Sequence, residues 1–438
     1  MEWWEILLIV FSGTAVLLLS GMPVAFCFIL INLVAVFVLQ GGGKAFHQLT
    51  LSMYSSVTSF TLLPVPLFVL MGEILWHSKL AFRALDVLDK MLGRLPGRLS
   101  ILTVLTGTVF STLSGSTMAN TAMLGTMLLP DMERRGYKRS MSIGPILASG
   151  GLAMMIPPSA LAVIFAAVGK LSVGRILIGA LIPGLIMAAL YMIYIVVRCW
   201  LQPGLTPPYE ATPVGLSEKI RSFVKHLLPL GFIVFLVTGL IVLGIATPTE
   251  SAALGCLGSF VLAAAYRALS WEVIKAAVIG SVKITAMTLA ILVGAIGFSQ
   301  MLAFSGASRG LLEFVVSLPI SPILLILCMQ FVVLMLGTFL EQIAIMLITL
   351  PIFMPIIAVL GFDPIWFGIL MLINLQMALT TPPFGLLLFV MKGVAPEGTT
   401  MREIYLAGLP FLVCDGIAMT IIIAFPQTVS WLQNLAYT

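Results

Sequence analysis

The sequence contains very little charge for its length. Of its 438 residues, 9% carry a charged side chain, whereas 60% are hydrophobic. A water-soluble domain of this size needs more polar surface than such a composition supplies. The mean hydropathy of +1.16 therefore indicates an integral membrane protein. With roughly 20 residues to a span, the chain has room for about ten crossings.

Motifs of several enzyme classes are also missing. The sequence has no G-x-x-x-x-G-K-[ST] loop to hold ATP phosphates, no H-E-x-x-H zinc motif and no G-x-S-x-G nucleophile motif. The three histidines lie near the ends of apolar segments, and the five cysteines are scattered, so neither set predicts a transition-metal site or a disulfide framework. We therefore expect no enzyme activity, no cofactor and no nucleic-acid partner.

What the sequence does contain is an internal repeat. Ile156-Pro157-Pro158-Ser159 in the first half matches Thr381-Pro382-Pro383-Phe384 in the second half. The same offset of 225 residues relates Pro23 to Pro248, Gly72 to Gly297, Pro130 to Pro355 and Gly136 to Gly361. Registered prolines and glycines over most of a chain indicate an ancestral duplication.

The sequence of each copy predicts five membrane spans and one re-entrant helical hairpin. Repeat 1 covers residues 1–205, and its hairpin covers residues 99–130. Repeat 2 covers residues 227–438, and its hairpin covers residues 319–355. The polar segment 206–226 between the repeats is predicted to be a cytoplasmic linker. Each hairpin has a polar or small-residue tip that is unsuited to an uninterrupted span. A helix broken at Pro-Pro follows each hairpin. Residues 79–98, which mix leucines with charges, predict an interfacial helix.

The distribution of basic residues indicates that the two copies are inverted. With the N-terminus outside, 18 of the 22 Lys and Arg residues fall in inside segments, as the positive-inside bias requires. The corner Arg134-Arg135-Gly136-Tyr137-Lys138-Arg139 is basic, but its counterpart 359–364 has no cation. We therefore predict an all-α integral membrane protein of two inverted repeats, with both termini on the outer face.

The hairpin tips and broken helices together predict two cation sites. Proline removes an N–H donor and frees a carbonyl one turn earlier, and carbonyl and hydroxyl oxygens suit an alkali cation. Site 1 is predicted from Ser114, Gly115, Ser116, Pro157, Pro158 and Ser159. Site 2 is predicted from Gly337, Thr338, Thr380, Thr381, Pro382 and Pro383. The alternative is that the prolines only kink spans and the small residues only allow close packing.

Polar side chains within apolar sequence are candidates for substrate contact. Glu341 lies at the second hairpin tip, and Asn120, Asn374 and Gln376 lie in predicted membrane segments. For the amides the alternative is hydrogen bonding between helices. Glu73 and Asp415 are further buried-acid candidates, and Glu250 equally suits a helix N-terminal cap.

The sequence resembles the large membrane subunit of tripartite ATP-independent periplasmic (TRAP) transporters over essentially its full length. The resembling stretches are Ser114-Gly115-Ser116, Leu129-Pro130-Asp131-Met132-Glu133-Arg134-Arg135-Gly136-Tyr137, Ile156-Pro157-Pro158-Ser159, Ala246-Thr247-Pro248-Thr249-Glu250, Phe339-Leu340-Glu341-Gln342-Ile343-Ala344-Ile345-Met346-Leu347 and Thr381-Pro382-Pro383-Phe384-Gly385. Their order along the chain makes the resemblance specific.

This resemblance implies a sodium-coupled, elevator-type importer in the bacterial inner membrane. It implies two partners: a small four-helix membrane subunit and a soluble periplasmic substrate-binding protein. Family cargoes are small organic acid anions such as C4-dicarboxylates, keto acids and sialic acids. Residues 99–200 and 319–430 would form the moving transport domain, and 1–98 and 227–318 the scaffold. Two alternatives are a stand-alone ion-coupled dicarboxylate carrier and a membrane-embedded enzyme, for which the sequence offers no nucleophile and base.

Overall fold

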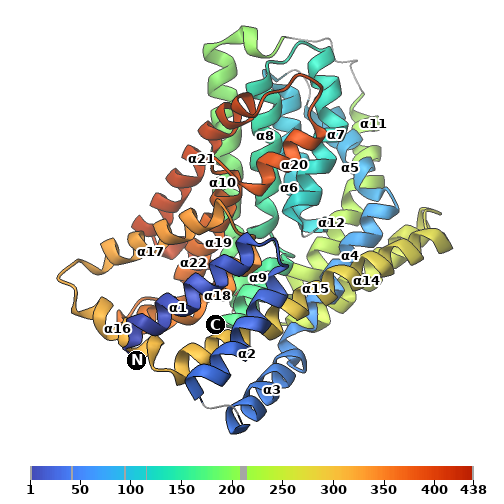
Figure 1. The fold of residues 1–438 in the computed structure, drawn as a ribbon. Helices are drawn as coiled ribbons and strands as arrows, with labels where there is room; N and C mark the ends of the chain where they lie inside the picture. The colour runs from blue at the N-terminus through green and yellow to red at the C-terminus, as the bar shows by residue number, and fades with distance from the viewer. Residues whose placement is uncertain (1, 41–42, 93–94, 115, 208–214, 437–438) are drawn as a thin grey trace.

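The computed structural model describes residues 2–40, 43–92, 95–114, 116–207 and 215–436, and all regular elements within these ranges are helices (Figure 1). The first half contains α1 (Trp3–Leu19), α2 (Val24–Gln40), α3 (Gly43–Val57), α4 (Pro64–His77), α5 (Leu80–Leu92), α6 (Arg98–Ser114), α7 (Thr117–Arg134), α8 (Arg139–Gly151), α9 (Ala160–Val168) and α10 (Val173–Leu201). The second half contains α11 (Leu216–Ser222), α12 (Leu228–Val234), α13 (Leu240–Val242), α14 (Pro248–Ala265), α15 (Trp271–Phe304), α16 (Ala307–Ser317), α17 (Pro322–Gly337), α18 (Gln342–Val359), α19 (Pro364–Thr380), α20 (Leu386–Val394), α21 (Met401–Ala424) and α22 (Gln427–Ala436). The predicted all-helical class is confirmed.

Many of these helices suit a bilayer. By length and composition, seven helical segments of the described chain can cross a membrane, namely Phe60–His77, Val173–Leu201, Leu216–Val242, Pro248–Ala265, Trp271–Phe304, Gln342–Val359 and Met401–Ala424. Shorter apolar helices include α1, α17 and α19. An apolar helix shorter than a full span fits a hairpin arm or a broken helix. The fold is that of a multi-pass membrane protein.

Helix ends in the two halves follow the 225-residue offset closely. Helices α7 and α18 begin at Thr117 and Gln342 and end at Arg134 and Val359, and each has 18 residues. Helices α8 and α19 then begin at Arg139 and Pro364. Both Pro-Pro bonds, Pro157-Pro158 and Pro382-Pro383, are cis and follow the ends of these helices. The 225-residue offset found in the sequence therefore also relates the positions of these helix ends in the structure.

Two helices start earlier than the sequence predicts. The sequence predicts a span from about Leu227 to Leu243. In the structure this stretch is part of a continuous helical segment from Leu216, because Leu216, Ile220 and Val224 extend an apolar face by one turn at a time. The sequence also predicts a span from about Ile284 to Phe304, but in the structure this helix begins at Trp271. The first copy has a break at this position, between α3 and α4, where Pro64 starts α4. Proline cannot continue a helix from the preceding turn, and the second copy lacks it.

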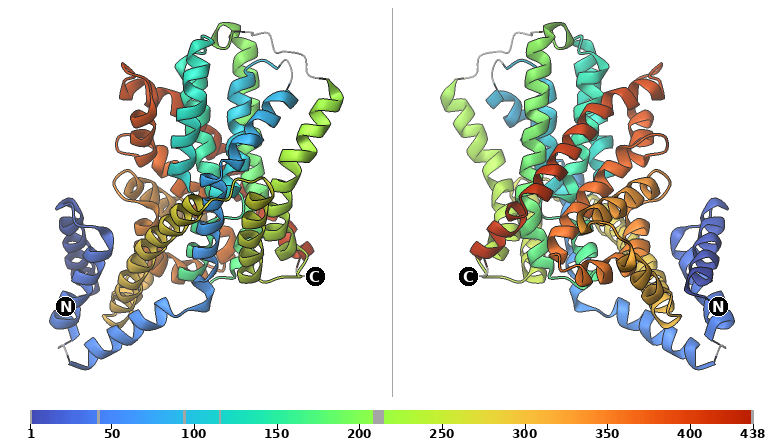
Figure 2. Two further views of the ribbon diagram at one scale, coloured as in Figure 1. Left: turned by 90° about the vertical axis from the view of Figure 1, so that its right-hand side faces the viewer. Right: turned by 90° about the vertical axis from the view of Figure 1, so that its left-hand side faces the viewer.

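The hairpins and broken helices form the centre of the molecule. In Figure 1, α6 and α7 lie in the upper half, α17 lies at the left at the height of α19, and α18 lies below α19. Helix α8 packs against α6, α7 and α21, and α19 packs against α17 and α10. Nearly all side chains of α8 and α19 are buried. Figure 2 shows α1 and α2 at the periphery, with α3 crossing the lower edge, and both termini in the lower half.

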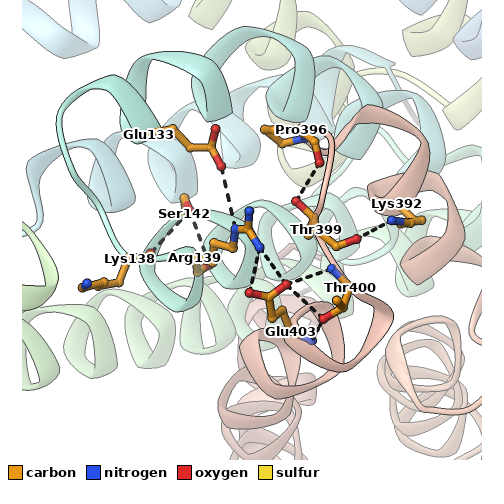
Figure 3. Close-up of polar contacts among 9 residues, drawn as sticks. All are labelled: Glu133, Lys138, Arg139, Ser142, Lys392, Pro396, Thr399, Thr400 and Glu403. Carbon is orange, nitrogen blue, oxygen red and sulfur yellow. Dashed lines mark hydrogen bonds and ion pairs between the residues drawn. The ribbon is translucent and has the colours of Figure 1, made fainter.

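A polar network connects the start of α8 to the start of α21 (Figure 3). The Nη1 atom of Arg139 donates to both carboxylate oxygens of Glu403 at 2.7 Å, and Glu133 lies 3.9 Å from the Arg139 Nε atom. Glu403 also accepts a hydrogen bond from the Thr400 N–H at 2.8 Å, which closes a capping box. Two segments far apart in sequence are thus joined at one end of the bundle.

Candidate transport site

Two cavities lie between the central helices and α15, and the smaller of them also borders α4. The smaller, here called the tip cavity, has a volume of 270 Å³ and is walled by residues from α4, α7, α9, α15 and α18. Its lining side chains include Glu73, Trp76, Ser116, Thr117, Met118, Ala160, Thr288, Glu341 and Gln342. The tips of both hairpins therefore reach one cavity.

The two hairpins contribute equivalent residues to the tip cavity. Ser116 and Glu341 are the N-caps of α7 and α18, and Thr117 and Gln342 are the first residues of these helices. Ser116 Oγ accepts a hydrogen bond from the Ala119 N–H at 3.3 Å. A helix N-terminus carries unpaired N–H groups and a partial positive charge. Two such ends at one cavity make it favourable for an anionic group.

The first predicted cation site is partly within the described residues. Gly115 lies outside them, and so does the side chain of Ser114. Pro157, Pro158 and Ser159 are buried, and Ser159 caps α9 by accepting from the Ala162 N–H at 3.2 Å. Ser116 lines the tip cavity together with Ala160, the residue after Ser159. The first hairpin tip and the first broken helix thus meet at this cavity.

At the second predicted cation site, helix α17 closely approaches helix α19. Gly337 at the end of α17 lies so close to α19 that a Cβ atom there would be 2.1 Å from the Ala378 Cβ. Thr338 Oγ1 donates to the Met335 carbonyl at 2.7 Å. On α19, Thr380 and Thr381 both donate to the Met377 carbonyl, at 3.0 and 2.7 Å. All of these hydroxyls keep lone pairs for a cation.

Two carbonyl groups at the second Pro-Pro break already accept one hydrogen bond each. The Pro383 carbonyl accepts a hydrogen bond from Tyr405 at 2.8 Å, and the Thr381 carbonyl accepts from the Gly385 N–H at 3.2 Å. Each carbonyl has a second lone pair, which remains suitable for a cation. A Cβ at Gly385 would lie 2.4 Å from the Leu379 carbonyl oxygen, so only glycine allows this turn.

Three of the four predicted substrate residues form contacts between helices. Asn120 is buried and donates to the carbonyls of Gly107 and Ser149 at 3.2 and 3.3 Å. Asn374 donates to the Gln330 side chain at 2.8 Å. Gln376 is fully buried against Gly151, at the contact of α19 with α8. Glu341 lines the tip cavity. The substrate role of the three amides stays a prediction.

The other acidic candidates have different surroundings. Glu73 lines the tip cavity and pairs with His77 at 3.2 Å. Glu250 forms a capping box with Thr247, accepting from its N–H at 2.8 Å, which confirms the cap geometry. Asp415 on α21 is buried and accepts a hydrogen bond from Tyr191 on α10.

The larger cavity has a volume of 760 Å³ and lies farther along the same helices. On α9 its lining begins at Ala166, whereas the tip cavity is lined by Ala160, Leu161 and Ile164. On α18 the larger cavity contacts residues 350–355, whereas the tip cavity contacts 341–343. The two cavities thus occupy successive stretches of one helical wall.

Three residues with contacts at the site are not among the residues predicted from the sequence. Two of them, Thr117 and Gln342, each directly follow a hairpin tip at the same 225-residue offset, so the repeat could have identified them. Gln330 pairs with Asn374 across helices α17 and α19, and no local pattern indicates that pairing.

Comparison with known proteins gives a consistent assignment. Residues 11–428 match the family described as "Tripartite ATP-independent periplasmic transporter, DctM component". The C4-dicarboxylate TRAP transporter large permease protein DctM of Pseudomonas aeruginosa is 33% identical over 393 residues, which cover 89% of this chain and 90% of that protein. The ectoine TRAP transporter large permease protein TeaC of Halomonas elongata is 28% identical, with 96% of this chain and 97% of that protein covered.

A solved structure supports the fold independently. The YdaH transporter of Alcanivorax borkumensis has a TM-score of 0.67, with 93% of this chain and 99% of that chain covered, at 13% sequence identity. At this identity the likeness concerns the fold alone. The family match covers nearly the whole chain, and so this protein belongs to the TRAP transporter family as its large permease subunit, a transporter rather than an enzyme.

Proposed function

We propose that this subunit carries out sodium-coupled import of a small organic acid, delivered by a periplasmic binding protein, across the bacterial inner membrane. A small four-helix subunit would complete the membrane complex. The observation that carries the proposal is the tip cavity, where the N-terminal ends of α7 and α18 meet between α4 and α15. Paired helix ends near the middle of a membrane bundle are typical of transporters that bind anions.

Alternating access by an elevator motion is the mechanism we infer. Residues 99–200 and 319–430 would move together as the transport domain, carrying both hairpin tips. The bond between Arg139 and Glu403 supports their movement as one body, because it joins the two segments. The wall shared by the two cavities supports a path along α9 and α15. Inverted repeats with the termini outside would make the two ends of this path structurally related.

Sodium would bind at the two predicted cation sites. For the first, the supporting observation is that Ser116 lies beside Ala160 at one cavity. For the second, it is the close approach of Gly337, the residue before Thr338, to Ala378 on α19. The donors are hydroxyl and carbonyl oxygens, which suit hard cations and not transition metals.

Reconstitution in liposomes tests the proposal. The complete membrane complex and its cognate binding protein are expected to drive uptake of labelled organic acid only with an inward sodium gradient. Uptake that persists without the binding protein would instead favour a stand-alone carrier. Uptake that ignores the sodium gradient would contradict the coupling.

A further inference from the structure

The larger cavity has a polar lining with one charged residue. The polar residues on it include Ser59, Thr61, Ser299, Gln300 and Ser308. Among the described residues that line this cavity, only Lys170 is charged, and it forms no ion pair with the described part of the chain. A positive charge in a cavity with low-dielectric walls attracts anions. The lining therefore suits a small, negatively charged molecule.

The larger cavity lies between the proposed transport domain and the scaffold. Lys170 follows α9 of the transport domain, whereas Ser55 on α3 and Ser308 on α16 belong to the scaffold. In Figure 1, α3 and α16 lie at the lower end of the molecule, in the half that contains both termini. The sequence predicts this end to be the outer one. An organic acid released there by a binding protein would meet the larger cavity before the tip cavity.

We propose that the larger cavity is an entry site for the cargo, in which Lys170 pairs with a carboxylate of the incoming organic acid. The inference rests on the proposed function, because it places a further cargo site on the path to the tip cavity. The volume of 760 Å³ lies within the range of small-molecule sites, about 300–1,000 Å³. Lys170 is exposed, and an exposed pair of charges is weak, so the cargo can leave again for the tip cavity.

The entry site is expected to be unselective. One ammonium group recognises a carboxylate of any small organic acid, and a rotatable hydroxyl can either donate or accept a hydrogen bond. Neither group distinguishes one carbon skeleton from another. Organic acids of different shapes should therefore bind here with similar, low affinity.

The backbone at Lys170 allows the charge to be removed without disturbing the loop. Lys170 has a φ of 54°, in the left-handed region that favours glycine. The second copy has Gly398 at this place, with a φ of 82°. Each residue lies two positions before a helix N-cap, which is Ser172 for α10 and Thr400 for α21. Lys170→Gly should therefore keep the backbone conformation and remove only the side chain.

Lys79 provides a matched control. It follows α4 as Lys170 follows α9, and its φ is 57°. A basic residue is favourable at the end of either helix because of the helix dipole. Lys79 lines neither cavity, so Lys79→Gly removes an equivalent charge away from the proposed site. Lys170→Arg keeps the charge, and Arg267, with a φ of 53°, shows that arginine adopts this conformation.

Thiol labelling of the purified membrane complex, without the binding protein, measures occupation of the entry site. Ala303→Cys, in a Cys328→Ala background that removes an exposed thiol, places a reactive group on the lining. Succinate, pyruvate and N-acetylneuraminate should each slow maleimide labelling at about millimolar concentration, and neutral succinamide should not. Lys170→Gly should raise the half-protecting concentrations about fivefold. Lys79→Gly and Lys170→Arg should leave them unchanged.

A second measurement reports the charge of the cavity directly. The thiol at position 303 is treated with an anionic and with a cationic methanethiosulfonate, and the two rates are compared. Lys170→Gly should lower the ratio of the anionic to the cationic rate, because it removes the positive charge that attracts the anionic reagent. Lys79→Gly should not change this ratio. An unchanged ratio in Lys170→Gly would overturn the proposal.

The protection data can also overturn the proposal. Equal protection by succinamide, or half-protecting concentrations unchanged in Lys170→Gly, would do so. If Lys170 instead binds an acidic segment of the binding protein, Lys170→Gly would weaken uptake and leave succinate protection unchanged, which also overturns it. Sodium-driven uptake without any protection would refute the entry site and leave the proposed function intact. Protection in a complex without sodium-driven uptake would support the entry site and contradict the proposed function.

Discussion

The side chain of Gln376 lies directly on the backbone of Gly151, its counterpart 225 residues earlier in the chain. A Cβ atom at position 151 would be 1.6 Å from the Gln376 Nε2 atom. Equivalent positions that touch lie where the two halves meet, so this contact joins α8 to α19 at the centre of the protein. Both helices are almost completely buried, and neither can move aside without disturbing its neighbours.

Gly151→Ala is therefore expected to destabilise the protein. The added methyl group overpacks a buried contact, which costs about 1–3 kcal/mol. Thermal unfolding in detergent should show a lower Tm, and Gln376→Ala in the same chain should restore part of it by removing the clashing amide. Gly416→Ala is the matched control, because a Cβ there meets no atom within 4 Å. Equal changes in Tm for the two alanine variants would refute the packing argument.

Much of this centre could be predicted from the sequence, and part of it could not. The breaks at Pro157 and Pro382 are local, since proline ends a helix wherever it lies. The contact of Gln376 with Gly151 depends on which helices lie side by side, and the pairing of Asn374 with Gln330 does too. The helix α15 begins before the predicted start at Ile284, because the proline that starts α4 in the first copy, Pro64, has no counterpart in the second copy.

The ion pair between Arg139 and Glu403 gives a second prediction. Both side chains are partly exposed, at 34% and 40%, so solvent screens the pair and its coupling free energy should be small but different from zero. A double-mutant cycle with Arg139→Gln and Glu403→Gln, followed by thermal unfolding, measures it. The far more exposed pair Arg309 and Glu313 should give a coupling near zero. Additive effects at Arg139 and Glu403 would contradict the network drawn in Figure 3.

Loss of the capping box at the start of α14 is expected to lower the stability of the protein without changing transport. Thr247 Oγ1 accepts from the Glu250 N–H at 3.3 Å, and losing such an N-cap costs about 1 kcal/mol. Thr247→Ala should lower the Tm while leaving the sodium dependence of uptake unchanged. Thr420→Ala removes an exposed hydroxyl that bonds within its own helix and should change the Tm less. A shifted sodium dependence in Thr247→Ala would point to a functional role for Glu250.

The hydroxyls of Ser116 and Thr381 give the most direct test of the two predicted sodium sites. Thr381 Oγ1 uses its proton on the Met377 carbonyl, so its lone pairs remain available for a cation. Ser116→Ala and Thr381→Ala should each raise the sodium concentration for half-maximal uptake about tenfold, which corresponds to about 1.4 kcal/mol. The control is Thr428→Ala on α22, where the hydroxyl bonds to the nearby Phe425 carbonyl. Uptake must be measured across a sodium series at fixed cargo, because a lost cap at Ser116 lowers the Tm and the maximal rate without altering that concentration. If both variants keep the sodium dependence of the unmodified protein, the two cation sites lie elsewhere.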